Sequence, residues 1–220
     1  MRDLEWSGYV LKDFRFDFAA GSRVLDVGCG EGRQLSILAA EGVWPCGIDM
    51  SMTVLRSCRS RGLPVVQGRG ERLPYLPEYF DGVICKVVLP YVNERTTIRE
   101  IGRVLRPGGV AYFVSHGAGY YLRYVLQPPH FAFWLYGTRT LLNTWLWATT
   151  GRLLPGFLGD TLFQSRRRLL ECYRAAGLEL EGESPSPKYL GSSVFLYDRV
   201  KKIGSGACEC DNFSPPLAAG

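Results

Sequence analysis

The 220-residue sequence lacks several features that define common protein classes. Its first residues, MRDLEWSGYVLKDFRFDF, scatter charges among apolar side chains and lead to no small-residue cleavage site, so no secretory signal is predicted. The longest apolar stretch, residues 131–150, is about long enough to span a bilayer but contains Arg139, Asn143 and several threonines. We therefore expect neither a secreted nor a membrane-spanning protein, and predict a cytoplasmic one.

Cysteine is present in an odd number, seven, and without a second ligand cluster. Most of the cysteines fall in segments with a strand or helix pattern, which is typical of small buried thiols in a reducing compartment. Cys208 and Cys210 form a single C-x-C pair, and no partner cluster of cysteine or histidine accompanies it. No metal site is predicted, and the role of this pair stays open.

The net charge of +5 is modest, but it is unevenly placed. Residues 119–170 contain six arginines and one acidic residue, Asp160, which accounts for the whole excess. Three of these arginines stand together at 166–168, without the extended basic stripe that is typical of nucleic-acid binding. A nucleic-acid partner is therefore not expected.

From Ser22 onward, short β-branched runs alternate with longer segments of helical period, which favours a mostly parallel sheet with helices on both faces. Strands are predicted at 23–28, 43–50, 63–68, 80–88, 110–116, 178–183 and 193–202, and helices at 31–42, 51–62, 93–105 and 165–177. Ser51 and Asn93 are the expected N-caps of two of these helices, and RPGG, residues 106–109, is the expected turn before the strand at 110. The last two strands have no helix between them and predict a terminal antiparallel hairpin. We expect an α/β fold: a doubly wound seven-stranded sheet in one domain, 1–202, with an α-helical cap insertion at about 117–162 and a tail at 203–220.

The stretch VLDVGCGEGR places glycines at alternate positions directly behind a buried strand. Gly28 and Gly30 let the backbone approach a ligand closely, and the following helix offers unpaired N–H groups. Asp49, about 20 residues further on, ends the second strand and can accept both hydroxyls of a ribose. A nicotinamide cofactor would satisfy both features. However, the loop is G-x-G-x-G, and Asp26 before it would repel a pyrophosphate while suiting a ligand with an ammonium and a sulfonium group.

Together with GIDMS, GERLPYLPEYFDGVI and IREIGRVLRPGGVAYFV, this loop resembles, in order and spacing, the motifs of class I S-adenosylmethionine-dependent methyltransferases. The resemblance runs from about Ser22 to Ser115 and resumes weakly over 163–201. It implies S-adenosylmethionine as the cofactor. The implied cofactor-binding residues are Asp26, Gly28, Cys29, Gly30, Asp49, Met50, Gly70, Glu71 and Lys86. One departure is Arg69, which stands where the family often has an acidic residue that binds the amino group of the adenine. We expect the backbone around Gly70 and Glu71 to take the place of that acidic residue.

The catalytic candidates follow strands four and five, because reacting groups gather beyond the carboxyl ends of a doubly wound sheet. They are Lys86, Tyr91 and His116. Methyl transfer from a sulfonium depends mainly on alignment and exclusion of water, and a base helps when the acceptor must lose a proton. His116 is the preferred base, since an unperturbed imidazole titrates near pH ~6.5, although it could equally cap its strand.

The segment 119–162 lies where this family commonly inserts a cap over the substrate, and residues 119–170 hold 11 of the 28 aromatic residues. Its helices could pack on the core or a second subunit, form a lid over an apolar acceptor, or dock on an anionic membrane surface. The predicted function is methyl transfer to a small, apolar or aromatic molecule. The alternative is a cofactor-binding module without catalysis that uses the aromatic segment for a protein or membrane partner. No oligomeric state is indicated.

Overall fold

One seven-stranded sheet forms the centre of the computed structural model, which describes residues 14–152, 154, 161–183, 186 and 188–204. The spatial order of the strands is β3-β2-β1-β4-β5-β9-β6. Their bounds are β1 Arg23–Val27, β2 Trp44–Asp49, β3 Val65–Gln67, β4 Phe80–Lys86, β5 Leu105–His116, β6 Leu178–Glu183 and β9 Phe195–Lys202. Among these seven strands only β9 runs antiparallel to its neighbours, β5 and β6, so the predicted mostly parallel sheet and its terminal antiparallel pair are confirmed.

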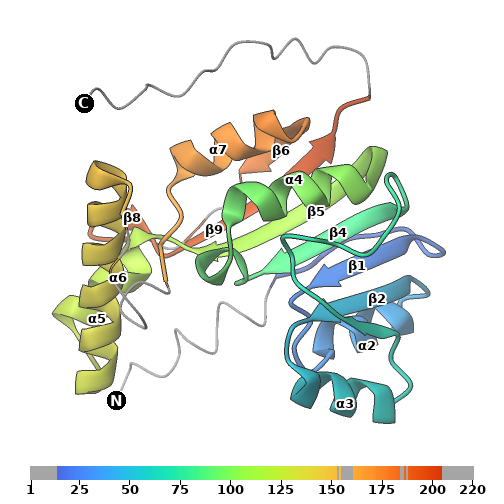
Figure 1. Ribbon diagram of the computed structural model, residues 1–220, viewed down its shortest axis with the longest axis horizontal. Coiled ribbons are helices and arrows are strands. Elements are labelled where there is room, and N and C mark those ends of the chain that lie inside the picture. Colours follow the sequence, from blue (N-terminus) through green and yellow to red (C-terminus); the bar gives the residue numbers. More distant parts are fainter. Residues whose placement is uncertain (1–13, 153, 155–160, 184–185, 187, 205–220) are drawn as a thin grey trace.

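Helices cover both faces of this sheet (Figure 1). The helices are α2 Arg33–Ala40, α3 Met52–Ser60, α4 Glu94–Val104, α5 Ala118–Leu126, α6 Phe131–Thr150 and α7 Arg166–Ala175, with a short 3-10 helix, η1, at Leu89–Tyr91. The largest buried cluster lies under α4 and α7 and includes Ile98, Phe113 and Leu169. A second cluster on the other face joins Leu38 of α2 to Phe16 of the N-terminal segment. The sheet is therefore doubly wound.

Two helix starts are capped as their sequences suggest. Asn93 Oδ1 accepts a hydrogen bond from Thr96 N at 3.0 Å before α4, as predicted, and Ser165 caps α7 in the same way through Arg168 N. Ser51 occupies the expected position before α3, but its hydroxyl makes no capping bond. Its backbone N–H instead donates to Asp49 Oδ1 at 2.9 Å, which ties the start of α3 to the end of β2.

Two predicted boundaries were wrong. The RPGG stretch was expected to be a turn before a strand at 110, but it lies within β5, and the register with β4 jumps from Phe80↔Leu105 to Gly82↔Val110. The last strand was expected over 193–202, but Ser192–Ser193 (β8) pairs with Lys188–Tyr189 (β7) in a separate two-stranded sheet. An irregular pairing in the first case and a separate hairpin in the second change the boundary, and strand propensity encodes neither.

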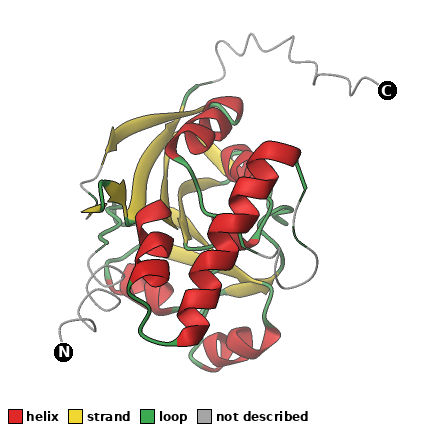
Figure 2. Ribbon diagram, turned by 90° about the vertical axis from the view of Figure 1, so that its left-hand side faces the viewer, coloured by secondary structure: helices red, strands yellow, loops and turns green. Residues whose placement is uncertain are grey.

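Helices α5 and α6 stand at the end of the sheet toward which the arrowheads of β1 and β4 point (Figure 1). This places the helical segment after β5 beyond the carboxyl ends of the central parallel strands. The two helices lie side by side and antiparallel in front of the sheet (Figure 2). No helix within the described residues is long and apolar enough to cross a membrane.

Candidate active site

The loop after β1 is held against the end of β2. Gly28 and Gly30 have positive φ angles, 71° and 51°, that favour glycine, and the backbone N–H groups of Gly28 and Cys29 both donate to Ile48 O. A Cβ at Gly28 would come within 2.3 Å of Val88 Cγ2, whereas a Cβ at Gly30 would meet no described atom within 4 Å. Gly28 therefore permits close packing of the loop after β4, and Gly30 faces open space.

Asp49 anchors the other side of this loop. Its Oδ2 accepts from Gly30 N at 3.0 Å and its Oδ1 from Ser51 N at 2.9 Å. A carboxylate accepts about four hydrogen bonds, so these two contacts orient the group and leave capacity for about two more donors. Met50, which follows, exposes 64% of its surface. Asp49 is thus fixed in place with an apolar side chain beside it.

Asp26 is a buried carboxyl group beside this loop, with 4% of its surface exposed. Burial raises its pKa to about 7, the charge of Lys86 opposes the rise, and the charge of Asp49 adds to it. Lys86 has a lowered pKa, because its own burial and the charge of Arg33 outweigh the influence of Asp26. Two acidic groups and one partly buried cation therefore share the space at the ends of β1, β2 and β4. Such a space favours a ligand that carries positive charge.

The segment after β3 is fixed by packing and by α4. A Cβ at Gly70 would lie 3.0 Å from Thr97 Cγ2 and 3.3 Å from Val27 Cγ1, so this position requires a small residue. Glu71 Oε1 accepts from Asn93 N at 3.2 Å, and its Oε2 lies 3.7 Å from Arg69 Nε. The Arg69 side chain is 68% exposed. The Glu71 carboxylate is thus directed to the start of α4.

His116 ends β5 inside a cluster of aromatic rings. Its ring stacks on Tyr120 with centroids 3.8 Å apart and an interplanar angle of 1°, and it contacts the edge of Phe195 at 5.3 Å. Burial lowers the pKa of His116 to about 4, and its Nδ1 has no hydrogen-bond partner within the described residues. The imidazole is therefore neutral at pH 7 and able to accept a proton, though it is a weak base.

Tyr91, half-exposed in η1, connects the end of β4 to the helical segment. Its hydroxyl lies 3.2 Å from the hydroxyl of Tyr136 on α6, and Tyr136 packs against Tyr121 at 5.7 Å. Sequence reasoning did not identify this tyrosine network. The density of aromatic residues after β5 was the available signal, but the partners of each ring depend on how α5 and α6 cross.

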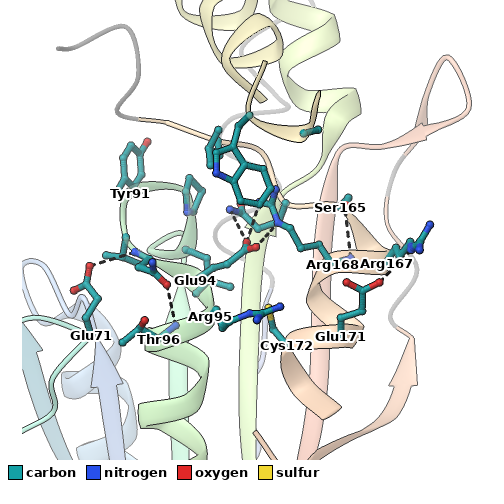
Figure 3. Close-up of a pocket in the computed structure, with 18 residues that line it drawn as sticks. Glu71, Tyr91, Glu94, Arg95, Thr96, Ser165, Arg167, Arg168, Glu171 and Cys172 are labelled. Carbon is teal, nitrogen blue, oxygen red and sulfur yellow. Dashed lines mark hydrogen bonds and ion pairs between the residues drawn. The ribbon is translucent and has the colours of Figure 1, made fainter. Parts of the chain in front are cut away.

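A cavity of about 880 Å³ adjoins Tyr91 (Figure 3). It lies between η1, the starts of α4 and α7, and the end of α6. Its apolar wall consists of Leu89, Pro90, Tyr91, Val92, Trp147, Ala148 and Leu162. Its polar wall includes Arg168, which forms an ion pair with Glu94. The Arg168 guanidinium carbon lies 4.7 Å from the centroid of the Trp147 ring. This volume falls within the range of about 300 to 1,000 Å³ that is usual for small-molecule sites.

Comparisons with known proteins agree with this geometry. Residues 25–113 match a family described as "Methyltransferase domain". Demethylmenaquinone methyltransferase of Corynebacterium efficiens is 34% identical over 96 residues, which cover 43% of this chain and 42% of that protein. The protein of the same name from Mycobacterium sp. (strain KMS) is 39% identical over 90 residues, covering 40% and 39%. The chain thus matches less than half the length of these curated relatives.

Among solved structures, an S-adenosylmethionine-dependent methyltransferase from Methanosarcina mazei aligns with a TM-score of 0.63 at 19% identity, over 89% of this chain and 97% of that one. The chain has the class I methyltransferase fold. The predicted resemblance is confirmed, and S-adenosylmethionine is the cofactor that these matches imply, as expected.

The residues at the ends of β1 and β2 fit S-adenosylmethionine. Burial raises the pKa of the Asp26 carboxyl more than the charge of Lys86 lowers it, and the cofactor carries an ammonium and a sulfonium group that would favour the ionised form. Asp49 retains acceptor capacity for ribose hydroxyls, and Gly30 leaves space beside the loop. All of the predicted roles toward the cofactor stay predictions: those of Asp26, Gly28, Cys29, Gly30, Asp49, Met50, Gly70, Glu71 and Lys86. Cys208 and Cys210 lie outside the described residues.

Proposed function

We propose that this protein transfers a methyl group from S-adenosylmethionine to a small apolar acceptor bound in the cavity beside Tyr91. The observation that carries this proposal is the position of that cavity. It lies next to the carboxyl end of β4, it is walled on one side by apolar side chains of η1 and α6, and it contains Glu71 from the segment that follows β3. Acceptor and cofactor spaces would therefore adjoin.

The acceptor class follows from the lining of the cavity and from the curated relatives. Trp147 and Leu162 offer flat and aliphatic surface to an apolar ring, while the Glu94–Arg168 pair keeps its own charges satisfied. The relatives are named for demethylmenaquinone, an apolar quinone. We therefore propose a quinone-type or similar aromatic acceptor.

The chain's residues would act mainly through binding and exclusion of water. When bound, S-adenosylmethionine supplies a methyl group on a sulfonium, which leaves as a neutral thioether. Asp26 would provide negative charge for the cationic end, and Asp49 would hold the ribose. Lys86, close enough to influence the pKa of Asp26, helps to keep that carboxyl ionised. Alignment of the two ligands in a dry space supplies most of the acceleration of such a displacement.

A general base contributes less in this proposal. His116, the preferred candidate, has its pKa lowered to about 4, so it takes up a proton from an acceptor only weakly. Burial also raises the pKa of the Tyr136 hydroxyl well above its usual value, which keeps that group protonated as a hydrogen-bond donor. Tyr91 and Tyr136 are accordingly proposed to position the acceptor.

An acceptor panel tests this proposal. The protein is incubated with methyl-labelled S-adenosylmethionine and with three acceptors: a naphthoquinol without its ring methyl group, a simple phenol and a polar nucleoside. We expect S-adenosylhomocysteine and a labelled product with the naphthoquinol, and none with the nucleoside. The Asp26→Asn variant should lose this turnover. Cofactor binding without turnover of any acceptor would instead support the alternative, a cofactor-binding module without catalysis.

A further inference from the structure

Helix α6 has its apolar side on the outside. Its buried residues are small or polar: Gly137, Thr140, Asn143 and Thr144. Its exposed residues include Phe131, Trp134, Leu135, Leu142 and Trp145, with 74%, 38%, 39%, 50% and 62% of their surfaces exposed. A surface helix of a globular protein normally shows the opposite arrangement, with the apolar stripe facing the core.

Hydrogen bonds fix this orientation from the inside. Asn143 Nδ2 donates to Thr161 O at 3.0 Å, and its Oδ1 accepts from Leu154 N at 3.0 Å. The hydroxyls of Thr140 and Thr144 donate to backbone carbonyls one turn earlier in α6, at 2.8 and 2.7 Å. Gly137 allows close approach to α5, since a Cβ there would lie 2.8 Å from Tyr121 O. The Asn143 bonds and the close approach at Gly137 fix the inner face, and α6 cannot rotate its aromatic residues inward without losing them. The two threonine bonds lie within α6 and satisfy hydroxyls on that inner face.

Most of the exposed apolar residues of α6 lie on one side of the helix. Phe131, Trp134, Leu135, Leu142 and Trp145 recur at helical spacing along α6, and Leu126, the last residue of α5, is 53% exposed. We call these six residues the outer face. Figure 2 looks at the molecule from this side and shows α6 lying along the front of the molecule.

The charge of this segment indicates what covers the outer face. Residues 119–152 contain three arginines and not a single aspartate or glutamate, and Arg152, just after α6, is exposed. Arg139 instead contacts Thr161 and the ring of Tyr136. Two copies of this surface would bring like charges together, whereas an anionic lipid headgroup complements them. Tryptophan and phenylalanine on one side of a helix with arginine nearby are also the side chains that suit the membrane interface.

A series of ring contacts runs from Phe133, a neighbour of the outer face on α6, to the proposed acceptor site. Phe133, next to the outer face, packs on Tyr124 with ring centroids 4.9 Å apart, and Tyr124 contacts Tyr136 at 6.5 Å. Tyr136 in turn shares a hydroxyl contact with Tyr91, which lines the cavity. A chain of aromatic contacts thus connects the surface of α6 with the acceptor cavity.

From these observations we infer that α6 lies in the interface of an anionic lipid bilayer, with its outer face in the acyl region, and that the acceptor is taken from that bilayer. The part of this inference that concerns the acceptor rests on the proposed function. Binding to the bilayer does not, because it is a property of the surface of α6 itself. It involves insertion of one face of the helix, and no membrane-spanning segment.

Flotation with vesicles tests the inference. Vesicles of phosphatidylcholine alone are compared with vesicles that also contain phosphatidylglycerol, using the full chain. The double variant Phe131→Ser/Trp145→Ser removes the two most exposed rings of the outer face. The matched control, Trp44→Ser/Leu76→Ser, removes side chains that are 71% and 72% exposed and lie away from α6. We expect the wild type and the control to float with the anionic vesicles and the outer-face variant to lose at least about tenfold in partitioning.

Three results would overturn the inference: no flotation of the wild type, equal loss in both double variants, or a dimer of the wild type that the outer-face variant abolishes without any vesicle binding. In the last case a second copy covers α6. Quenching of wild-type tryptophan fluorescence by lipids with brominated acyl chains gives the same answer without any substitution. Turnover of a water-soluble naphthoquinol without vesicles is measured in parallel. Turnover without flotation refutes the membrane inference alone, and flotation without turnover refutes the proposed function alone.

Discussion

Replacing Asp26 by asparagine should change stability and cofactor affinity in opposite directions. The carboxyl group is buried and its pKa is raised from 3.8 to about 7, mainly by desolvation. Because the folded-state pKa lies above the unfolded one, ionisation destabilises the fold, and stability falls as the pH rises from 3.8 to about 7. At 1.36 kcal/mol per pKa unit, the free energy of unfolding falls by about 4 kcal/mol in total over this pH range. The asparagine amide does not ionise, so the variant escapes this loss.

The assay is urea denaturation of both proteins at pH 5 and pH 8 without cofactor. Between these two pH values the stability of the wild type relative to Asp26→Asn should fall by about 2 to 3 kcal/mol, because most of the ionisation occurs in this range. Titration calorimetry with S-adenosylmethionine should show the reverse. The wild type binds about tenfold more tightly at pH 8 than at pH 6 when the ionised carboxylate is the binding form, and the variant shows no such dependence. A pH-independent difference in stability, or equal affinity in the variant, would refute the reasoning.

Three further substitutions test other parts of the site, and a fourth, Gly62→Ala, is the control for Gly30→Ala. Gly30→Ala and Gly62→Ala both place alanine at a positive φ angle, and in both the added Cβ meets no described atom within 4 Å. Each substitution should therefore lower the free energy of unfolding, measured by urea denaturation, by about 1 to 2 kcal/mol. Only Gly30→Ala should also weaken S-adenosylmethionine binding, and equal affinities would remove Gly30 from the site. Tyr91→Phe deletes the hydroxyl contact with Tyr136. The KM for the acceptor should therefore rise about fivefold while the KM for the cofactor stays constant. A change in the KM for the cofactor alone would contradict this role of Tyr91. Burial lowers the pKa of His116 to about 4. Between pH 7 and pH 5 the free energy of unfolding of the wild type should therefore fall by about 2 kcal/mol relative to that of His116→Phe. A difference that stays constant with pH would argue against a buried neutral imidazole.

The arrangement of the sheet could be predicted from the sequence, because alternation and glycine placement act locally. The apolar run before Gly28 and the acidic end of the next strand identified β1, β2 and the loop between them. Asn93 was recognised as a cap because its preference for that position is a property of its side chain. These features need only neighbouring residues to take effect.

Features that depend on packing could not be predicted in this way. The raised pKa of Asp26 arises from its burial in the central strand β1, and the lowered pKa of His116 from burial among the rings of Tyr120 and Phe195. The same holds for the Tyr91–Tyr136 contact, which joins residues 45 positions apart. The inside-out character of α6 is visible only once its buried residues are known. Sequence reasoning proposed candidate residues for the site, but it could not give their burial or their electrostatic state.

The most direct test of the account is a single-turnover measurement of methyl transfer. Enzyme in excess over methyl-labelled S-adenosylmethionine is mixed with a demethylated naphthoquinol, and label is counted in the organic phase after extraction. We predict that label moves into the organic phase with the wild type and with Gly62→Ala, and stays in the aqueous phase with Asp26→Asn. Label that remains aqueous with the wild type, although S-adenosylmethionine binds, would contradict methyl transfer to an apolar acceptor.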